Sequence, residues 1–145
     1  MSTTPDPTDV AGRLAVVVGR VARRIRPTHG DLSAGHFSTL ASVERLGPLR
    51  PSDLARIERV GAPAMTRIVA LLESRGLLER SASPDDARSV LLHLTEDGRQ
   101  VVQDVRTERA GIVGELIADL DADELRAVAD ALAPLERVAR TATER

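Results

Sequence analysis

The chain has 145 residues, of which 42% are hydrophobic and 29% are charged, and its formal net charge is −2. This length fits one globular domain covering residues 1–145, and no apolar run approaches the roughly 20 residues that a membrane-spanning helix needs. Cysteine is absent, which excludes disulfides, thiolate metal sites and cysteine nucleophiles. The start of the chain, MSTTPDPTDV, lacks the basic and apolar parts of a signal peptide, so we expect a cytoplasmic protein.

Two helices are predicted in the first third of the chain. The first follows Thr8, a residue that can cap a helix, and ends near Pro27. After a connector at residues 28–36, the second helix continues until the GP pair at 47–48 ends it. In the first helix, spacings of three and four form an apolar stripe of Val10, Leu14, Val17, Val18, Val21 and Ile25. In the second helix, we expect Phe37, Leu40 and either Val43 or Leu46 to point inward.

Two short helices with a tight join follow. Pro51 stands where a third helix can begin, and Gly61 can cap a fourth that tolerates Pro63 in its first turn and ends at Gly76. The spacing is that of a helix-turn-helix motif. The side chains available for packing are Leu54, Ala55 and Ile57 in the third helix, and Met65, Ile68, Val69 and Leu72 on one face of the fourth.

A β-hairpin is predicted next, from the runs LLERS at 77–81 and SVLLHL at 89–94. The intervening ASPDDAR is too long for a minimal two-residue turn, so the tip of the hairpin must project. The predicted fold is therefore mainly α with a small β-hairpin wing, an α+β arrangement.

The last third of the chain predicts two more helices. Thr95 can cap a long helix whose apolar stripe runs from Val101 to Leu120. DADE at 121–124 is an acidic version of the capping box and opens a final helix, which Pro134 should kink or divide.

The exposed side of the predicted fourth helix is the first candidate site. It carries Ala62, Pro63, Thr66 and Arg67, so small residues near the N-terminus allow close approach while a hydroxyl and a guanidinium reach polar groups. Residues 45–80 hold seven arginines against four acids, which suits an anionic partner. A DNA major groove accepts such a helix, but an ordinary amphipathic helix with an incidental Thr-Arg pair fits equally well.

The hairpin tip is the second candidate site. Arg88 can enter a DNA minor groove, where a guanidinium meets concentrated negative potential. We expect Asp86 to orient that guanidinium through a charge-assisted hydrogen bond. Turn chemistry is the alternative for the PDD segment, because Pro and Asp favour turns. It competes with a functional role at Asp85, whereas both interpretations can hold for Asp86.

The ordered segments LSAGHFSTL, GPLRPSDLA, MTRIVALLESRGLLER and PDDARSVLLHLTEDG resemble the multiple-antibiotic-resistance regulator (MarR) family of winged helix-turn-helix transcription factors. The resemblance implies a homodimer joined through helical regions at 8–30 and 111–142, with winged lobes at 33–96 that each contact half of an inverted repeat. It places Thr66 and Arg67 in the major groove and Arg88 in the minor groove. It also makes Ser52, Arg75 and Arg80 phosphate candidates, although each of these side chains can simply be solvated.

The chain departs from the family pattern at several positions: Gly61 replaces a frequent serine cap, Ala87 a frequent wing arginine and Arg50 the usual threonine, and Pro134 interrupts the last helix. Many relatives bind a small phenolic or anionic effector that releases DNA. The resemblance places Arg26, His29 and His36 near such a pocket, while a lone histidine is more often packed or solvated.

The sequence thus predicts a sequence-specific regulator that binds double-stranded DNA as a homodimer, most simply a repressor, without a cofactor or a metal ion. An enzyme is the first alternative, but GxSxG, Walker-loop, GxGxxG and metal-binding patterns are all missing. A winged-helix module that contacts only proteins is the second alternative, and it differs in lacking salt-sensitive binding to DNA.

Overall fold

Six helices and one antiparallel hairpin make up the part of the chain that the computed structural model describes, residues 5–26 and 30–144. In chain order they are α1 (Pro7–Arg24), α2 (Ala34–Leu46), α3 (Pro51–Glu58), α4 (Ala62–Ser74), β1 (Leu78–Ala82), β2 (Val90–Leu94), α5 (Glu96–Ile117) and α6 (Ala122–Glu144). This mainly helical arrangement with one hairpin confirms the fold class predicted from the sequence. None of the helices in the described ranges is long and apolar enough to cross a membrane.

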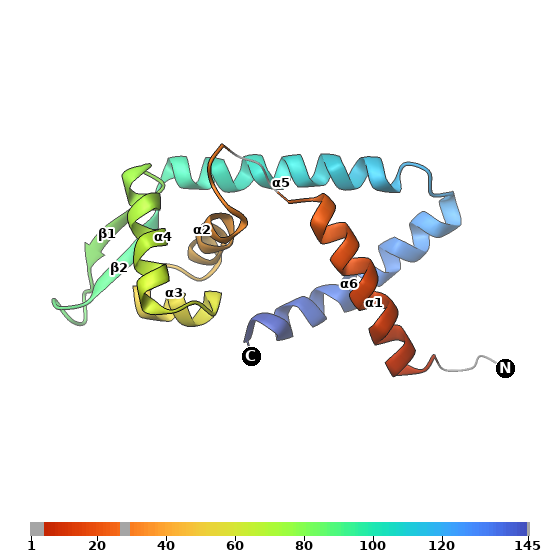
Figure 1. Cartoon of the computed structure of the whole chain (residues 1–145), viewed down its shortest axis with the longest axis horizontal. Helices are drawn as coiled ribbons and strands as arrows, with labels where there is room; N and C mark the ends of the chain where they lie inside the picture. Colours follow the sequence, from red (N-terminus) through yellow and green to blue (C-terminus); the bar gives the residue numbers. More distant parts are fainter. Residues whose placement is uncertain (1–4, 27–29, 145) are drawn as a thin grey trace.

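The hydrophobic core lies in a winged lobe formed by α2, α3, α4, the hairpin and the first turns of α5 (Figure 1). The face predicted to be buried on α4 is confirmed at Met65, Val69 and Leu72, and Ile68 packs partly buried against the same cluster. The other buried apolar side chains are Leu32, Phe37, Leu40, Val43, Leu54, Ala55, Leu77, Leu78, Leu92, Leu94, Val102 and Val105. One continuous core thus fixes the helix-turn-helix and the hairpin relative to each other.

The hairpin is held in register from Leu78 opposite Leu94 to Ala82 opposite Val90. The edge of β2 that faces away from β1 pairs with the α2–α3 connection. There Leu49 donates its N–H to the Leu92 carbonyl at 3.2 Å and accepts from the Leu92 N–H at 2.8 Å. The residues that lead into α3 are therefore tied to the wing, because these two bonds fill the free edge of β2 at this point.

The start of α5 explains the LTEDG motif. The Thr95 hydroxyl accepts from the Gly98 N–H at 3.0 Å and donates to the Gly76 carbonyl at 2.6 Å, which confirms the predicted cap and joins it to the end of α4. A Cβ on Gly98 would lie 2.2 Å from the Leu77 carbonyl oxygen. Only glycine therefore lets α5 approach the beginning of β1 this closely.

One expectation about helix ends is corrected. The N-cap of α1 is Asp6, whose carboxylate accepts from the Thr8 N–H at 3.0 Å, so Thr8 lies inside the helix because Pro7 occupies its first position. Of the two inward candidates near the end of α2, Val43 is buried and Leu46 is 47% exposed, which confirms the first. The capping box of α6 is confirmed, since Asp121 accepts from the Glu124 N–H at 2.9 Å and Glu124 accepts from the Asp121 N–H at 3.0 Å.

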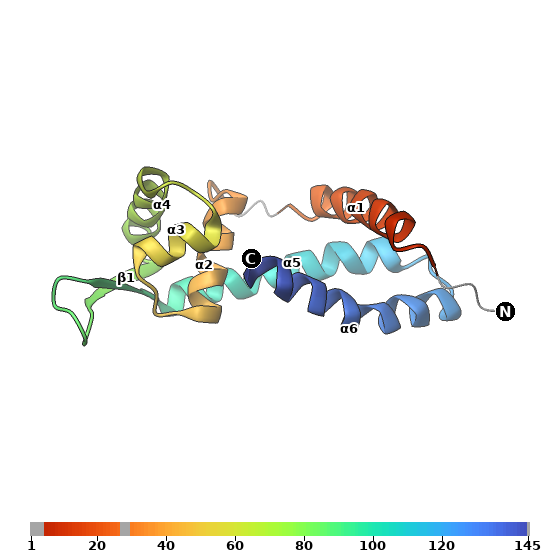
Figure 2. The ribbon, with the colours of Figure 1, turned by 90° about the horizontal axis from the view of Figure 1, so that it is seen from below.

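A second region, which we call the arms, consists of α1, α6 and the later turns of α5 and extends away from the winged lobe (Figures 1 and 2). No side chain of α1 is buried, and neither is any described side chain of α6. The arms nevertheless carry large apolar side chains that are 38% to 60% exposed: Val10, Val16, Val17 and Val18 on α1, Leu116 on α5, and Leu125, Val128, Leu132, Leu135 and Val138 on α6.

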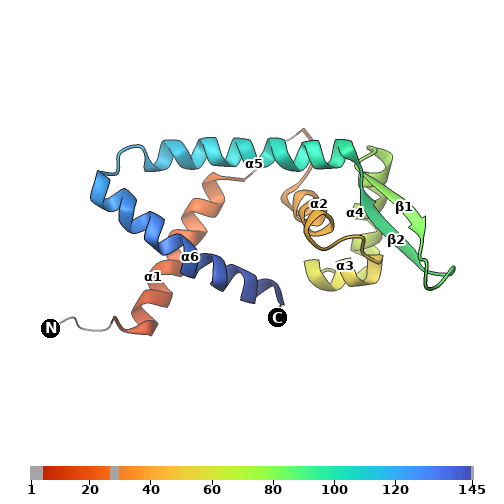
Figure 3. The same ribbon diagram turned by 180° about the vertical axis from the view of Figure 1, so that it is seen from behind.

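Pro134 does not divide the final helix, which contradicts one of the two outcomes predicted for it. α6 runs without interruption through this residue, although the ribbon changes direction along its length (Figures 1 and 3). A proline inside a helix leaves the carbonyl four residues earlier without its donor. Because the surrounding residues of α6 are exposed, water can satisfy that carbonyl here.

Candidate nucleic-acid interface

The start of α3, the start of α4 and the wing lie at the same end of the molecule, opposite the arms (Figures 1 and 3). Helix α3 packs against both α4 and β2, which holds the three parts together. Most of the residues predicted to contact DNA belong to these three parts, whereas Arg75 follows the C-terminal end of α4.

The outward side of α4 has the composition needed for a close approach to another surface. Ala62, Pro63, Thr66 and Arg67 are all exposed, and the Thr66 hydroxyl donates to the Ala62 carbonyl at 2.9 Å. The oxygen of Thr66 remains free to accept a hydrogen bond. Arg67 forms no ion pair with the described residues, so its guanidinium is available to an external partner.

Asp86 organises the backbone of the wing tip. Its carboxylate accepts from the Arg88 N–H at 2.9 Å and from the Ser89 hydroxyl at 3.1 Å, and the Ser89 N–H donates to the Asp86 carbonyl at 2.9 Å. The hydrogen bond from the Arg88 N–H, then that from Ser89, lowers the pKa of Asp86 below its ordinary value. The tip of the wing is therefore held by its own hydrogen bonds around a charged carboxylate.

This geometry corrects the role predicted for Asp86. The carboxylate holds the main chain of Arg88 rather than its guanidinium, because an aspartate two residues before an N–H closes a local turn with that N–H. The Arg88 side chain is exposed and makes no ion pair within the described ranges. Arg88 is thus presented outward by the turn, with its guanidinium free.

Arg75 and Arg80, two phosphate candidates, each have a carboxylate partner inside the lobe. Arg80 donates to both oxygens of Glu73, at 2.6 and 2.8 Å, and this pairing raises the pKa of Arg80. Arg75 pairs with Asp31, and its guanidinium lowers the pKa of that carboxyl below its usual value. Whether either side chain also contacts phosphate stays a prediction.

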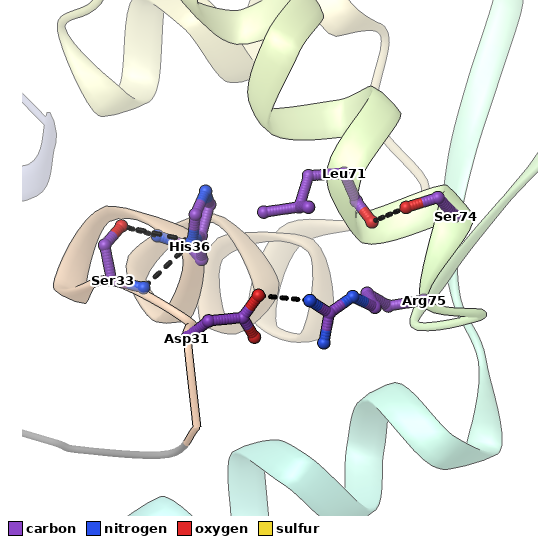
Figure 4. Close-up of polar contacts among 6 residues, drawn as sticks. All are labelled: Asp31, Ser33, His36, Leu71, Ser74 and Arg75. Atoms are coloured by element: carbon purple, nitrogen blue, oxygen red, sulfur yellow. Dashed lines mark hydrogen bonds and ion pairs between the residues drawn. The ribbon is translucent and has the colours of Figure 1, made fainter.

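Figure 4 shows the Arg75–Asp31 pair beside the N-terminus of α2. There Ser33 accepts from the His36 N–H at 3.3 Å, and the Nδ1 atom of His36 accepts from the Ser33 N–H at 2.9 Å. The pair links the connector that precedes α2 to the C-terminal end of α4. It thereby joins two segments 44 residues apart in the sequence.

Ser52, the remaining phosphate candidate, is exposed in the first turn of α3. The hairpin end of the lobe thus presents hydroxyl groups from two helices next to two unpaired guanidinium groups. This combination can donate hydrogen bonds to phosphate oxygens and base edges.

The residues predicted to bind an effector differ in their placement. Arg26 is exposed after α1, His29 lies outside the described residues, and His36 serves as part of the cap of α2. Their role in ligand binding stays a prediction. No group of three or more His, Cys, Asp or Glu with metal-binding geometry occurs among the residues that the structure describes.

Two cavities between α2 and α5 have different linings. One of about 470 Å³ is lined by Ser38, Ala41, Ser42, Glu44, Arg45 and Arg106, and a smaller one of about 40 Å³ by Phe37, Ala41, Val102, Val105, Arg106 and Arg109. The Nε atom of Arg109 is buried without a hydrogen-bond partner in the described structure. Sequence reasoning missed these arginines because α5 was expected only to supply apolar packing.

The sequence matches the model of the MarR family over residues 32–90. An uncharacterized HTH-type transcriptional regulator of Mycobacterium bovis is 34% identical over 131 residues, which cover 87% of this chain and 92% of the relative. The multiple antibiotic resistance protein MarR of Salmonella typhimurium is 32% identical over 119 residues, which cover 79% of this chain and 82% of the relative.

Solved structures agree with the fold. A transcriptional regulator of Thermotoga maritima has a TM-score of 0.78 at 24% identity, covering 95% of this chain and 99% of the other. The apo form of Escherichia coli MarR has a TM-score of 0.72 at 27% identity, covering 92% and 98%. Streptococcus pneumoniae FabT, solved in complex with DNA, has a TM-score of 0.63 at 21% identity, covering 94% and 99%.

Proposed function

The chain belongs to the MarR family, and from that premise we propose that it acts as a homodimer on an inverted-repeat operator in cytoplasmic DNA. It is a DNA-binding transcriptional regulator with a winged helix-turn-helix. We further propose which residues contact DNA and how an effector controls the dimer.

One observation carries the assignment of the DNA-contacting face. The exposed side of α4 and the wing tip lie at one end of the lobe, and each presents a guanidinium, Arg67 or Arg88, that no described carboxylate neutralises. Arginine forms paired hydrogen bonds with guanine edges and phosphates, and it enters narrow minor grooves.

We assign α4 to the major groove. Ala62 and Pro63 let its N-terminal backbone approach the duplex, while Thr66 and Arg67 contact base edges. Ser52 contacts a neighbouring phosphate, and Arg88 enters the flanking minor groove. Arg75 and Arg80 contribute positive potential, and a phosphate contact from either must compete with Asp31 or Glu73.

The exposed apolar side chains of the arms support the homodimer. Val17 is 56% exposed on α1, and Leu132 is 52% exposed on α6, alongside eight further large apolar side chains on α1, α5 and α6. A surface of this kind marks a protein interface, because burying it removes apolar area from water. A second copy of the same chain offers the matching arms, as expected for an interface with twofold symmetry.

We further propose that the regulator represses by occupying a promoter and that a small phenolic or anionic effector releases it. The cavities between α2 and α5 support this part through Arg109, whose buried Nε has no acceptor among the described residues. Arg106 lines both cavities but already pairs with Glu44 at 2.5 Å, so an anionic effector must compete with that carboxylate. A carboxylate or phenolate oxygen supplies such an acceptor.

Substitution of the two unpaired arginines tests the DNA assignment. In gel-shift titrations against the region upstream of its own gene, Arg67→Ala should cost about 1 to 3 kcal/mol and relax the choice of sequence. Arg88→Ala should weaken binding with a smaller change in sequence choice. Arg13→Ala is the matched control, since Arg13 is exposed on α1 and pairs with Asp9 at 3.8 Å.

Unchanged affinity in both variants would remove the assigned roles. If the wild-type protein binds no duplex, even at low salt, the alternative of a protein-contacting winged-helix module is favoured instead. DNA binding through phosphate contacts must weaken steeply as salt is added.

A further inference from the structure

Arg50 stands at the junction between the wing and α3. The preceding residue, Leu49, forms the bridge to Leu92 of β2, and Pro51 is the first residue of α3. Arg50 is the N-cap of that helix, with extended backbone angles of −72° and 146° and no side-chain capping hydrogen bond. Its backbone is thus fixed on both sides while its side chain takes no part in the cap.

The surroundings of Arg50 leave its guanidinium free. The residue is exposed and forms no ion pair with the described part of the chain. Its positive charge contributes to lowering the pKa of Asp86, so the guanidinium of Arg50 interacts electrostatically with the wing. Both oxygens of Asp86, however, already accept from the Arg88 N–H and the Ser89 hydroxyl.

The neighbouring arginines provide a contrast. Arg56 approaches Asp53 at 3.8 Å within α3, Arg75 pairs with Asp31, and Arg80 binds Glu73 through two hydrogen bonds. Arg50 keeps all five guanidinium donors unused by these carboxylates. A desolvated carboxylate or phosphate is the partner whose geometry matches this free group.

We propose that Arg50 binds a phosphate of the operator backbone between the groove contacted by α4 and the groove entered by the wing. The inference rests on the proposed function. Its geometric basis is the position of α3, which packs against both β2 and α4. Arg50 thereby contacts the DNA backbone from a position outside the hairpin tip. The bridge between Leu49 and Leu92 holds the main chain of Arg50 in this position.

The test is a salt series of fluorescence-anisotropy titrations with labelled upstream DNA. Arg50→Ala and Arg50→Gln should each weaken binding about three- to tenfold and reduce the slope of log affinity against log salt by about one per subunit. The loss should be similar on the operator and on a scrambled duplex, because a phosphate contact carries no sequence information. Arg50→Lys should restore most of the slope.

Arg56→Ala is the matched control, since Arg56 lies on the same helix and already approaches a carboxylate. It should leave the slope unchanged. An unchanged slope in both Arg50→Ala and Arg50→Gln, with salt-dependent binding by the wild type, would overturn this inference alone. Absence of salt-dependent binding by the wild type would overturn the proposed function and the inference together. A midpoint temperature of thermal unfolding equal to that of the wild type establishes that each variant keeps its fold.

Discussion

At the scale of single residues, the arginines of the winged lobe have two different uses. Arg75 and Arg80 form ion pairs within the lobe. Arg50, Arg67 and Arg88 are exposed and have no carboxylate partner among the described residues. The sequence identified these residues as basic, but it could not separate the two groups. Asp31 is 44 residues from Arg75, and such pairs appear only when the chain is folded.

The Arg75–Asp31 pair predicts a dependence of stability on pH. The pKa of Asp31 is lowered in the folded protein, chiefly by its hydrogen bond with Arg75. A depressed pKa contributes stability above the unfolded value, about 3.9 for aspartate, and this contribution is lost as pH falls through the folded value. Asp31→Asn should therefore be less stable than the wild type at pH 7 and should lose less stability on acidification to pH 3.

Chemical denaturation at several pH values between 7 and 3 measures this difference. Arg75→Gln should give the same flattened dependence, and the double variant should add nothing further, because both changes remove one interaction. Parallel pH curves for the wild type and Asp31→Asn would show that the pair does not contribute to folding stability.

At the scale of elements, the sequence predicted the order and type of every helix and strand. It succeeded where the signal is local, as in the cap at Thr95, the capping box at Asp121 and the spacing of the α4 core. It was wrong where neighbours compete, since Asp6 caps α1 instead of Thr8. Of the two outcomes predicted for Pro134, a kink or a division, the division does not occur.

The candidate site could be predicted in part for the same reason. Periodicity placed Thr66 and Arg67 on the exposed side of α4, and loop length predicted a projecting wing. The bridge at Leu49 depends on tertiary geometry and was not predicted, whereas the bonding of Asp86 to the main chain is the local turn chemistry that the sequence offered as an alternative. Arg50 was noticed only as a departure from the family pattern.

The junction between β1 and α5 predicts a stability effect that is specific to one glycine. Gly98→Ala should destabilise the fold by about 1 to 3 kcal/mol or more, because the added Cβ would overlap the Leu77 carbonyl oxygen. Gly114→Ala on the same helix is the matched control, with no atom within 4 Å of the new Cβ, and should stabilise by about 0.5 to 1 kcal/mol. Thermal or urea unfolding distinguishes the two, and equal effects would contradict the close approach seen at Gly98.

At the scale of the whole molecule, the division between a packed lobe and exposed arms is the main feature. The core of the lobe is complete in one chain, whereas α1 and α6 leave their apolar side chains in contact with solvent. The lobe therefore has a core of its own, whereas the apolar side chains of the arms are left for the proposed dimer to cover.

This difference predicts that a charge on the arms separates the subunits without unfolding the lobe. Leu132→Asp should convert a dimer into a monomer in size-exclusion chromatography with light scattering, because the carboxylate would be buried without a partner. Tight DNA binding should be lost as well, since one half-site remains. Asp130→Ala, a change at an exposed polar position of α6, should leave the dimer intact. A monomeric wild-type protein would refute the proposed assembly.

Helix α5 is one continuous rod of 22 residues that joins the wing to the far end of the molecule. At 1.5 Å per residue its length is about 33 Å. A lever of that length converts an angular change of about 10° at the arms into a displacement of about 6 Å at the lobe, nearly two base-pair steps along the duplex. In the proposed dimer, a modest tilt at the subunit junction would therefore be amplified into a loss of registry with the DNA grooves.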